Sequence, residues 1–80
     1  MKNEDVLQAF GLHLRRLREA RGWSQQALAD VCDVSKPTIY RLETARYSAT
    51  LDVLASLAQG LEISLSDLMQ FPVPPRPTAA

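Results

Sequence analysis

The sequence predicts an all-α fold of five short helices. Apolar residues recur at spacings of three and four along most of its 80 residues. Ser or Thr stands directly before several of these stretches, where helix N-caps are found. No stretch alternates apolar and polar residues as a half-buried strand does. A chain of this length forms one small domain. We expect residues 1–71 to form it and residues 72–80, with four prolines in the first six positions, to be a flexible tail.

The first predicted helix runs from about Asp5 to Ala20. Its expected buried stripe consists of Val6, Leu7, Phe10, Leu14 and Leu17. Gly22 follows the last helical residues, so we expect it to end the helix in the left-handed conformation.

The next two predicted helices are short and separated by one tight break. Residues 25–32 follow Ser24, a candidate N-cap, and carry the apolar residues Leu28, Ala29 and Val31. Residues 36–45 follow Ser35, a second candidate N-cap, with Pro37 in the first turn, where a missing N–H costs nothing. Ile39 and Leu42 form the apolar stripe of this helix. Two helices joined in this way, with polar residues at the start of the second, follow the helix-turn-helix plan, which inserts the second helix into a DNA major groove.

Two further helices complete the predicted domain. Thr50 is expected to cap the fourth, and Asp52 lies in its first turn, where the helix dipole favours an acid. Its expected apolar face is made of Leu51, Leu54, Ala55, Leu57 and Ala58. Ser64 is expected to cap a short fifth helix that carries Leu65, Leu68 and Met69.

Charge is distributed unevenly, although the net charge is zero. Residues 15–46 hold seven basic groups against four acidic ones, whereas the rest of the chain holds two basic groups against five acidic ones. A modest positive field therefore surrounds the predicted helix-turn-helix. A solvated helix face is an equally good explanation of the charges alone.

Catalytic and metal-binding residues are scarce. The sequence has one His and one Cys, and no metal-ligand spacing or glycine-rich phosphate loop. We interpret His13 as a helix residue at or near the surface, and Cys32 as a small core residue. We therefore expect no enzyme, no cofactor and no metal. The absence of a membrane span or signal-peptide pattern and the lone Cys predict a cytoplasmic protein.

Residues 10–69 resemble the Cro and phage-repressor type of helix-turn-helix protein, often called the Xre family. The resemblance rests on LRRLREARGWSQ, QALAD, VSKPTIYRLE and ATLDVLASLAQGLEISLSDLM, which are specific in combination. It implies a compact five-helix domain like that of the lambda repressor, acting as a sequence-specific transcriptional regulator of double-stranded DNA, and usually as a homodimeric repressor on a two-fold operator. It involves no small-molecule substrate and no membrane.

The same resemblance assigns roles to individual residues. Gln25 is expected to approach a phosphate and steady the recognition helix. The residues facing base edges are expected to be Lys36, Pro37, Thr38 and Arg41. Candidate backbone contacts are Gln26, Tyr40, Thr44 and Arg46, with Ser48 a weaker one, and Tyr40 is equally well explained as a surface aromatic. Arg18 and Glu43 match an ion pair between the first and third helices.

The predicted dimer interface contains Leu65, Leu68, Met69 and Phe71, although these residues would alternatively close the core of the monomer. Two other functions stay open: an antitoxin-like module whose main partner is a toxin protein, and a restriction-modification controller. An activator would in addition contact polymerase. The chain departs from the family at Asp33, Ala45 and Glu62, which stand where glycine is usual. Asp tolerates the left-handed conformation, so Asp33→Gly is predicted to be neutral or stabilising.

Overall fold

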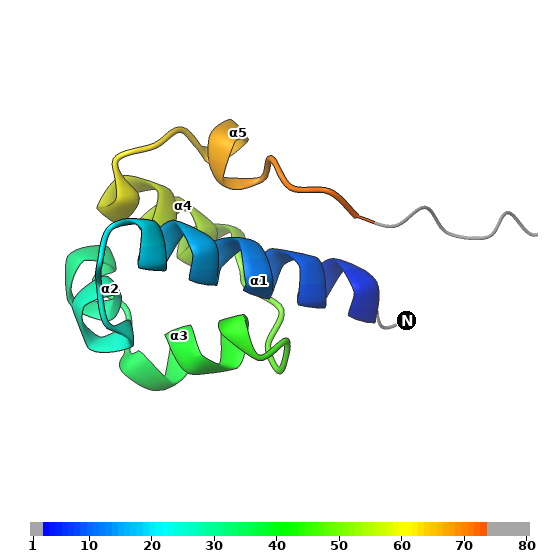
Figure 1. The fold of residues 1–80 in the computed structure, drawn as a ribbon, viewed down its shortest axis with the longest axis horizontal. Coiled ribbons are helices and arrows are strands. Elements are labelled where there is room, and N and C mark those ends of the chain that lie inside the picture. Colours follow the sequence, from blue (N-terminus) through cyan, green and yellow to red (C-terminus); the bar gives the residue numbers. More distant parts are fainter. Residues whose placement is uncertain (1–2, 74–80) are drawn as a thin grey trace, which may run out of the picture.

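The structure, a computed structural model, describes residues 3–73. Five helices follow one another: α1 Glu4–Ala20, α2 Gln25–Cys32, α3 Lys36–Glu43, α4 Leu51–Leu61 and α5 Leu65–Leu68 (Figure 1). The described part contains no strand, so the predicted five-helix all-α fold is confirmed. Most of the predicted Pro-rich tail lies outside the described residues. No helix between residues 3 and 73 is long and apolar enough to cross a membrane.

Side-chain caps set the starts of four helices as predicted. The hydroxyls of Ser24, Ser35, Thr50 and Ser64 each accept the backbone N–H three residues further on, at 2.9–3.2 Å. These bonds satisfy N–H groups that have no partner within the helix. The residue pattern located these starts because a cap acts within one turn.

A residue in the left-handed backbone conformation follows each of the helices α1 to α4. Gly22 takes this conformation after α1 as predicted, at φ 70°. At three positions where the family usually has glycine, this chain has other residues in the same left-handed conformation. These are Asp33, Ala45 and Glu62, with φ between 56° and 60°. The predicted end of α3 at Ala45 was therefore wrong, because the helix stops at Glu43 and Ala45 already turns the chain away. The joint between α4 and α5 keeps the usual turn, with Glu62 in place of glycine.

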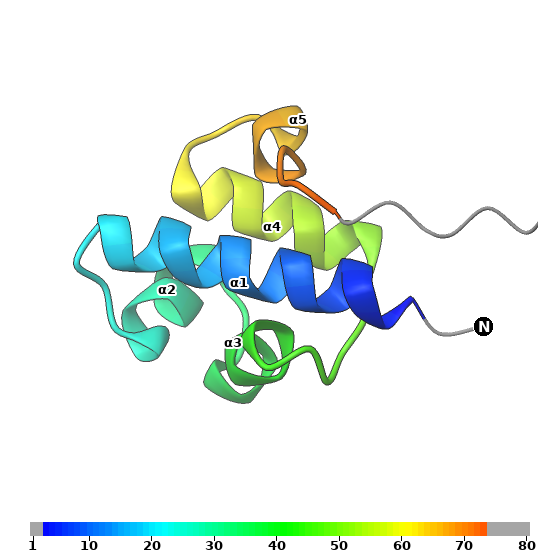
Figure 2. The ribbon, with the colours of Figure 1, turned by 45° about the vertical axis from the view of Figure 1, so that its right-hand side comes forward.

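The helices are arranged around α1. In Figure 2, α1 runs across the middle, with α4 and α5 above it and α2 and α3 below it. Helix α3 packs against α1 and α2, and α4 packs against α2 and α5. The helix-turn-helix of α2 and α3 thus has its inner side covered, and one side of α3 faces outward.

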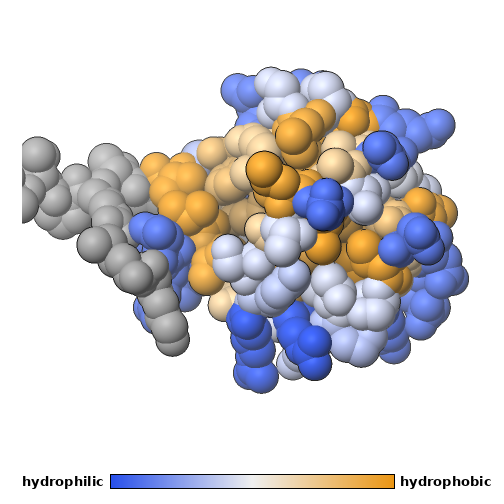
Figure 3. Space-filling view, turned by 180° about the vertical axis from the view of Figure 1, so that it is seen from behind, coloured by the Kyte–Doolittle hydropathy of each residue, from blue (hydrophilic) through white to orange (hydrophobic). Residues whose placement is uncertain are grey.

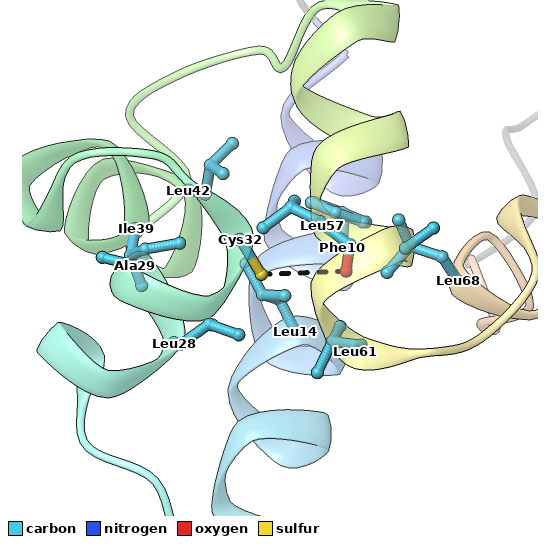
Figure 4. Packing of buried hydrophobic residues seen from close by; sticks show 11 residues of the cluster. Phe10, Leu14, Leu28, Ala29, Cys32, Ile39, Leu42, Leu57, Leu61 and Leu68 are labelled. Carbon is cyan, nitrogen blue, oxygen red and sulfur yellow. Dashed lines mark hydrogen bonds between the residues drawn. The ribbon is translucent and has the colours of Figure 1, made fainter.

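One hydrophobic core joins all five helices (Figure 4). Its buried members are Phe10, Leu14, Leu28, Ala29, Cys32, Ile39, Leu42, Leu57, Ala58, Leu61 and Leu68. Two residues predicted to lie on buried faces, and one further apolar residue, are instead exposed. Val6 and Leu51 lie in the first turns of their helices, and the side chain of Leu51 is 76% exposed. Val31 directly precedes Cys32, so it points about 100° away from the buried face of α2.

Two glycines allow helices to approach closely. A Cβ on Gly11 would lie 2.5 Å from the carbonyl oxygen of Leu42 in α3. A Cβ on Gly60 would lie 2.5 Å from the Sγ of Cys32 in α2. Neither distance is compatible with normal packing, so these glycines fix how near α1 lies to α3 and α4 to α2.

Candidate nucleic-acid interface

Helix α3 is anchored on one side and free on the other. Ile39 and Leu42 are almost completely buried in the core. Lys36, Pro37 and Arg41 are exposed, and Tyr40 is about half exposed. The residues predicted to face DNA therefore share the outer surface of α3; Thr38 is partly buried, but its hydroxyl lies in an exposed contact with that of Ser35. Because the first turn carries Pro37 and a side-chain cap, the exposed residues project from a fixed backbone.

The surface of α3 and its following loop is positively charged. Between residues 35 and 48 the basic side chains are Lys36, Arg41 and Arg46, all exposed. The single acid in this range, Glu43, is turned inward and paired. Two arginines counted toward the positive region in the sequence, Arg18 and Arg21, are instead engaged in contacts inside the fold. Figure 3, drawn from behind, shows hydrophilic residues along the lower edge, the side on which α3 lies in Figure 1.

The predicted ion pair joins α1 to α3. Arg18 donates from Nε to Oε2 of Glu43 at 2.7 Å and from Nη2 to Oε1 at 2.9 Å. Their side chains are only 12% and 3% exposed. Arg18 also donates from Nη1 to the backbone carbonyl of Trp23 at 2.9 Å. Hydrogen bonding to the Glu43 carboxylate is the main reason that the pKa of Arg18 is raised above its ordinary value. This two-pronged geometry fixes α3 against α1 in one orientation.

Gln25 completes this network from the start of α2. Its Nε2 donates to Oε1 of Glu43 at 3.2 Å. One amide hydrogen and the amide oxygen of Gln25 thus have no contact with this network. The neighbouring Gln26 bonds instead to Asp30 within its own helix, at 2.8 Å. The structure therefore brings Gln25, Arg18 and Glu43 together and leaves Gln26 outside the group.

Two hydroxyls, one on α3 and one on its C-cap residue, already have protein partners. Thr44 donates from Oγ1 to the carbonyl of Tyr40 at 2.7 Å. A phosphate oxygen only accepts hydrogen bonds, so Thr44 would have to break this bond to contact DNA. The hydroxyl of Thr38 lies 2.8 Å from that of Ser35. Arg46 and Ser48 are exposed on the loop after α3.

The sequence pattern did not predict the structural role of one side chain, Arg21. Arg21 donates to the carbonyl oxygens of Leu17 at 3.2 Å and of Leu61 at 2.7 Å, and its guanidinium lies 5.6 Å from the ring of Trp23. It therefore ties the end of α1 to the end of α4. No local pattern predicts this contact, because Arg21 and Leu61 are 40 residues apart.

The predicted dimer residues differ in exposure. Leu65 and Met69 are exposed, and Phe71 is partly buried, with its ring 5.7 Å from that of Phe10. Leu68 is fully buried in the core. Leu68 is thus removed from the predicted interface, because it has no surface to offer a partner. The alternative reading, that these residues close the core, holds for Leu68.

His13 and Cys32 lie apart from α3. The ring of His13 packs 5.4 Å from that of Phe71, and its Nε2 is buried with no hydrogen-bond partner. Burial raises the pKa of the Cys32 thiol to about 11, so the thiol is protonated at neutral pH. Within residues 3–73, no three His, Cys, Asp or Glu residues gather into a possible metal site.

Comparison with known proteins assigns the fold to a family. Residues 9–70 match the family model described as a helix-turn-helix domain. The chain is 32% identical over 69 residues to the HTH-type transcriptional regulator SutR of Escherichia coli, covering 86% of this chain and 39% of SutR. It is 36% identical over 59 residues to the competence pilus inhibition repressor of Acinetobacter baylyi, covering 74% of this chain and 54% of that protein. The chain thus spans about two fifths to one half of these relatives.

A solved structure of similar size shows the same arrangement. The restriction-modification controller protein C.AhdI of Aeromonas hydrophila is 32% identical, with a TM-score of 0.75 over 78% of this chain and 94% of that one. The region matched by the family model, residues 9–70, contains α2, α3 and most of α1. The chain therefore belongs to the Cro/C1-type helix-turn-helix family of transcriptional regulators.

Proposed function

We propose that this protein is a sequence-specific regulator that binds double-stranded DNA with α3 in the major groove. The observation that carries the proposal is the outer surface of α3, where Lys36, Arg41 and Arg46 are exposed while Glu43 is held inward by Arg18. A rigidly held helix with free cations on one side suits both the shape and the charge of the groove. The proposed function includes no chemical step.

The exposed residues divide into two roles. Lys36 and Arg41 donate to guanine O6 and N7, and Pro37 packs against a thymine methyl or stiffens the first turn. Each good base contact contributes about 1–3 kcal/mol of discrimination. Arg46, with the free amide hydrogen of Gln25, contacts phosphates. Such contacts supply most of the affinity and make it fall with salt.

We further propose that the protein works in the cytoplasm as a homodimeric repressor. Two subunits place two copies of α3 in successive major grooves, about 34 Å apart, on a two-fold operator. The surface proposed to pair them is formed by Leu65, Met69 and Phe71, on α5 and directly after it. Helix α5 lies on the opposite side of α1 from α3 (Figure 2). The name of the Acinetobacter relative, a repressor, supports this sign of regulation.

Selection of bound sequences from random duplex DNA tests the proposed reading of DNA. The wild-type protein should select a consensus with two related halves. Lys36→Ala and Arg41→Ala should each lose discrimination at one position in each half. Arg16→Ala is the matched control, because Arg16 lies on α1 beside Phe71 and Pro72. Selection of no consensus by the wild type would refute sequence-specific binding, and unchanged consensus in both variants would refute the assignment to α3.

Sedimentation tests the dimer. The wild-type protein should sediment as a dimer at micromolar concentration, and Met69→Glu should give a folded monomer. Val31→Glu is the control, because it places the same charge on an exposed apolar residue of α2. A monomeric wild type, or a Met69→Glu variant that still forms a dimer, would contradict the proposed surface.

The likeness to C.AhdI favours a second candidate, a restriction-modification controller. The match covers 94% of that controller, so this chain resembles the whole of it and not a part. In that case the operator lies upstream of genes for a restriction enzyme and its methyltransferase. Deletion of this gene should then change transcription of those neighbours, whereas transcription that does not change would exclude the controller role.

A further inference from the structure

We propose that Ser35 sets the hydrogen-bonding role of Thr38 toward DNA and presents it as a donor that selects keto bases, guanine or thymine. Ser35 is thus a positioning residue for base recognition, in addition to being the cap of α3. The inference rests on the proposed insertion of α3 into the major groove, and adds to it a chemical class of base.

The two hydroxyls form a closed pair in the first turn of α3. The Oγ of Ser35 accepts the backbone N–H of Thr38 at 3.2 Å. The same Oγ lies 2.8 Å from Oγ1 of Thr38, so a second hydrogen bond joins the hydroxyls themselves. Each hydroxyl has one proton. One of the two protons is used between them, and the pair keeps a single proton to donate outward.

The helix start favours one of the two proton arrangements of this pair. A hydroxyl that accepts a hydrogen bond becomes a stronger donor, so donors and acceptors in a chain reinforce one another. Here the chain begins at the N–H of Thr38, at the positive end of α3, passes through Ser35 and ends at Thr38 Oγ1. In the opposite arrangement, the Ser35 oxygen would accept two hydrogen bonds. The favoured arrangement leaves the Thr38 proton free to point outward.

A free hydroxyl proton distinguishes two classes of base. In the major groove, the keto oxygens of guanine (O6) and thymine (O4) accept hydrogen bonds. Guanine and adenine share the acceptor N7, so the discrimination comes from the keto oxygens. Adenine N6 and cytosine N4 present amino hydrogens, which need an acceptor. Thr38 used as a donor therefore favours guanine or thymine on the strand that it contacts.

Two substitutions of Ser35 separate positioning from capping. Ser35→Asp keeps a good N-cap, but a carboxylate only accepts, so Thr38 must donate to it and can offer only its lone pairs to DNA. Ser35→Gly is a tolerated cap without a hydroxyl and frees Thr38 for both roles. Ser24→Asp is the matched control, because Ser24 caps α2 in the same way and the residue three further on is Ala27, which has no hydroxyl.

The experiment has two steps. Selection of bound sequences by the wild type and by Thr38→Val first identifies the base position whose preference depends on Thr38. Four duplexes that differ only at that position then compete for the protein. The wild type should prefer keto bases there by about five- to tenfold, the worth of one hydrogen bond. Ser35→Asp should reverse this preference toward adenine or cytosine, and Ser35→Gly should weaken it. Ser24→Asp should lower affinity for all four duplexes equally.

The experiment separates failure of the Ser35 role from failure of sequence-specific DNA binding. If the wild type selects no consensus, sequence-specific binding itself is refuted. If it selects a consensus that Thr38→Val does not change, or if Ser35→Asp keeps the wild-type base preference, the role of Ser35 is refuted while DNA reading by α3 stands. An amino-base preference in the wild type would likewise overturn the inference.

Discussion

Removing the charge of Glu43 should destabilise the fold far more than removing an exposed acid. In Glu43→Gln, Arg18 stays charged although its side chain is only 12% exposed. Loss of one partner from a buried ion pair costs about 3–5 kcal/mol. Arg18 keeps its bond to the carbonyl of Trp23, and the new amide oxygen still accepts one hydrogen bond. We therefore expect a loss of about 2–3 kcal/mol in the free energy of unfolding.

The loss can be measured by urea unfolding. The fluorescence of Trp23, the single tryptophan, reports on the network, and far-ultraviolet circular dichroism reports on the helices. For a domain of this size the melting temperature should fall by about 10–20 °C. Glu19→Gln is the control, because the side chains of its pair with Arg15 are 58% and 54% exposed. It should cost less than about 0.5 kcal/mol.

A double substitution sharpens the test. Arg18→Met combined with Glu43→Leu replaces both charges by apolar side chains, so no unpaired charge is left in the interior. Most of the stability lost in Glu43→Gln should return. If Glu43→Gln costs no more than Glu19→Gln, the ion pair does not hold α3 and the argument for its rigid orientation fails.

Further outcomes follow from the backbone, the glycine contacts and the thiol. Ala45→Gly and Asp33→Gly should leave the melting temperature unchanged or raise it, because both residues have positive φ. Gly22→Ala should lower the free energy of unfolding by about 1 kcal/mol, because Gly22 also has positive φ although a Cβ there would meet no other atom. Gly11→Ala should weaken DNA binding in a titration more than Gly22→Ala does, because its Cβ would meet the backbone of α3. Stability should fall as pH rises from about 9 to 11, since the unfolded chain loses the Cys32 proton before the folded chain does. In Cys32→Ala this part of the pH dependence should be missing from the unfolding curves.

Local signals predicted the helix starts, because each cap acts within one turn. The hydroxyls of Ser24, Ser35, Thr50 and Ser64 stand directly before apolar periodic stretches, and each forms the expected bond. Periodicity was less reliable for burial. It assigned Val6 and Leu51 to buried faces because both are apolar, but it cannot tell which side of a helix has neighbours.

Contacts between residues far apart in the sequence could not be predicted from local sequence patterns. The pair of Arg18 and Glu43, 25 residues apart, was predicted only through the family resemblance. The bond from Arg21 to Leu61 and the close approach at Gly11 were not predicted, since both depend on how helices pack. The shared hydroxyls of Ser35 and Thr38 lie within one turn, but their pairing depends on side-chain rotamers that composition does not reveal.

Mapping the bound surface by backbone amide chemical shifts shows directly whether α3 contacts DNA. The protein is titrated with its selected duplex, and with a scrambled duplex as control. If α3 reads the DNA, the largest changes specific to the selected duplex fall on residues 35–46 and on the first turn of α2 around Gln25. Changes concentrated on α5 and the outer side of α1, with α3 unaffected, would contradict DNA reading by α3.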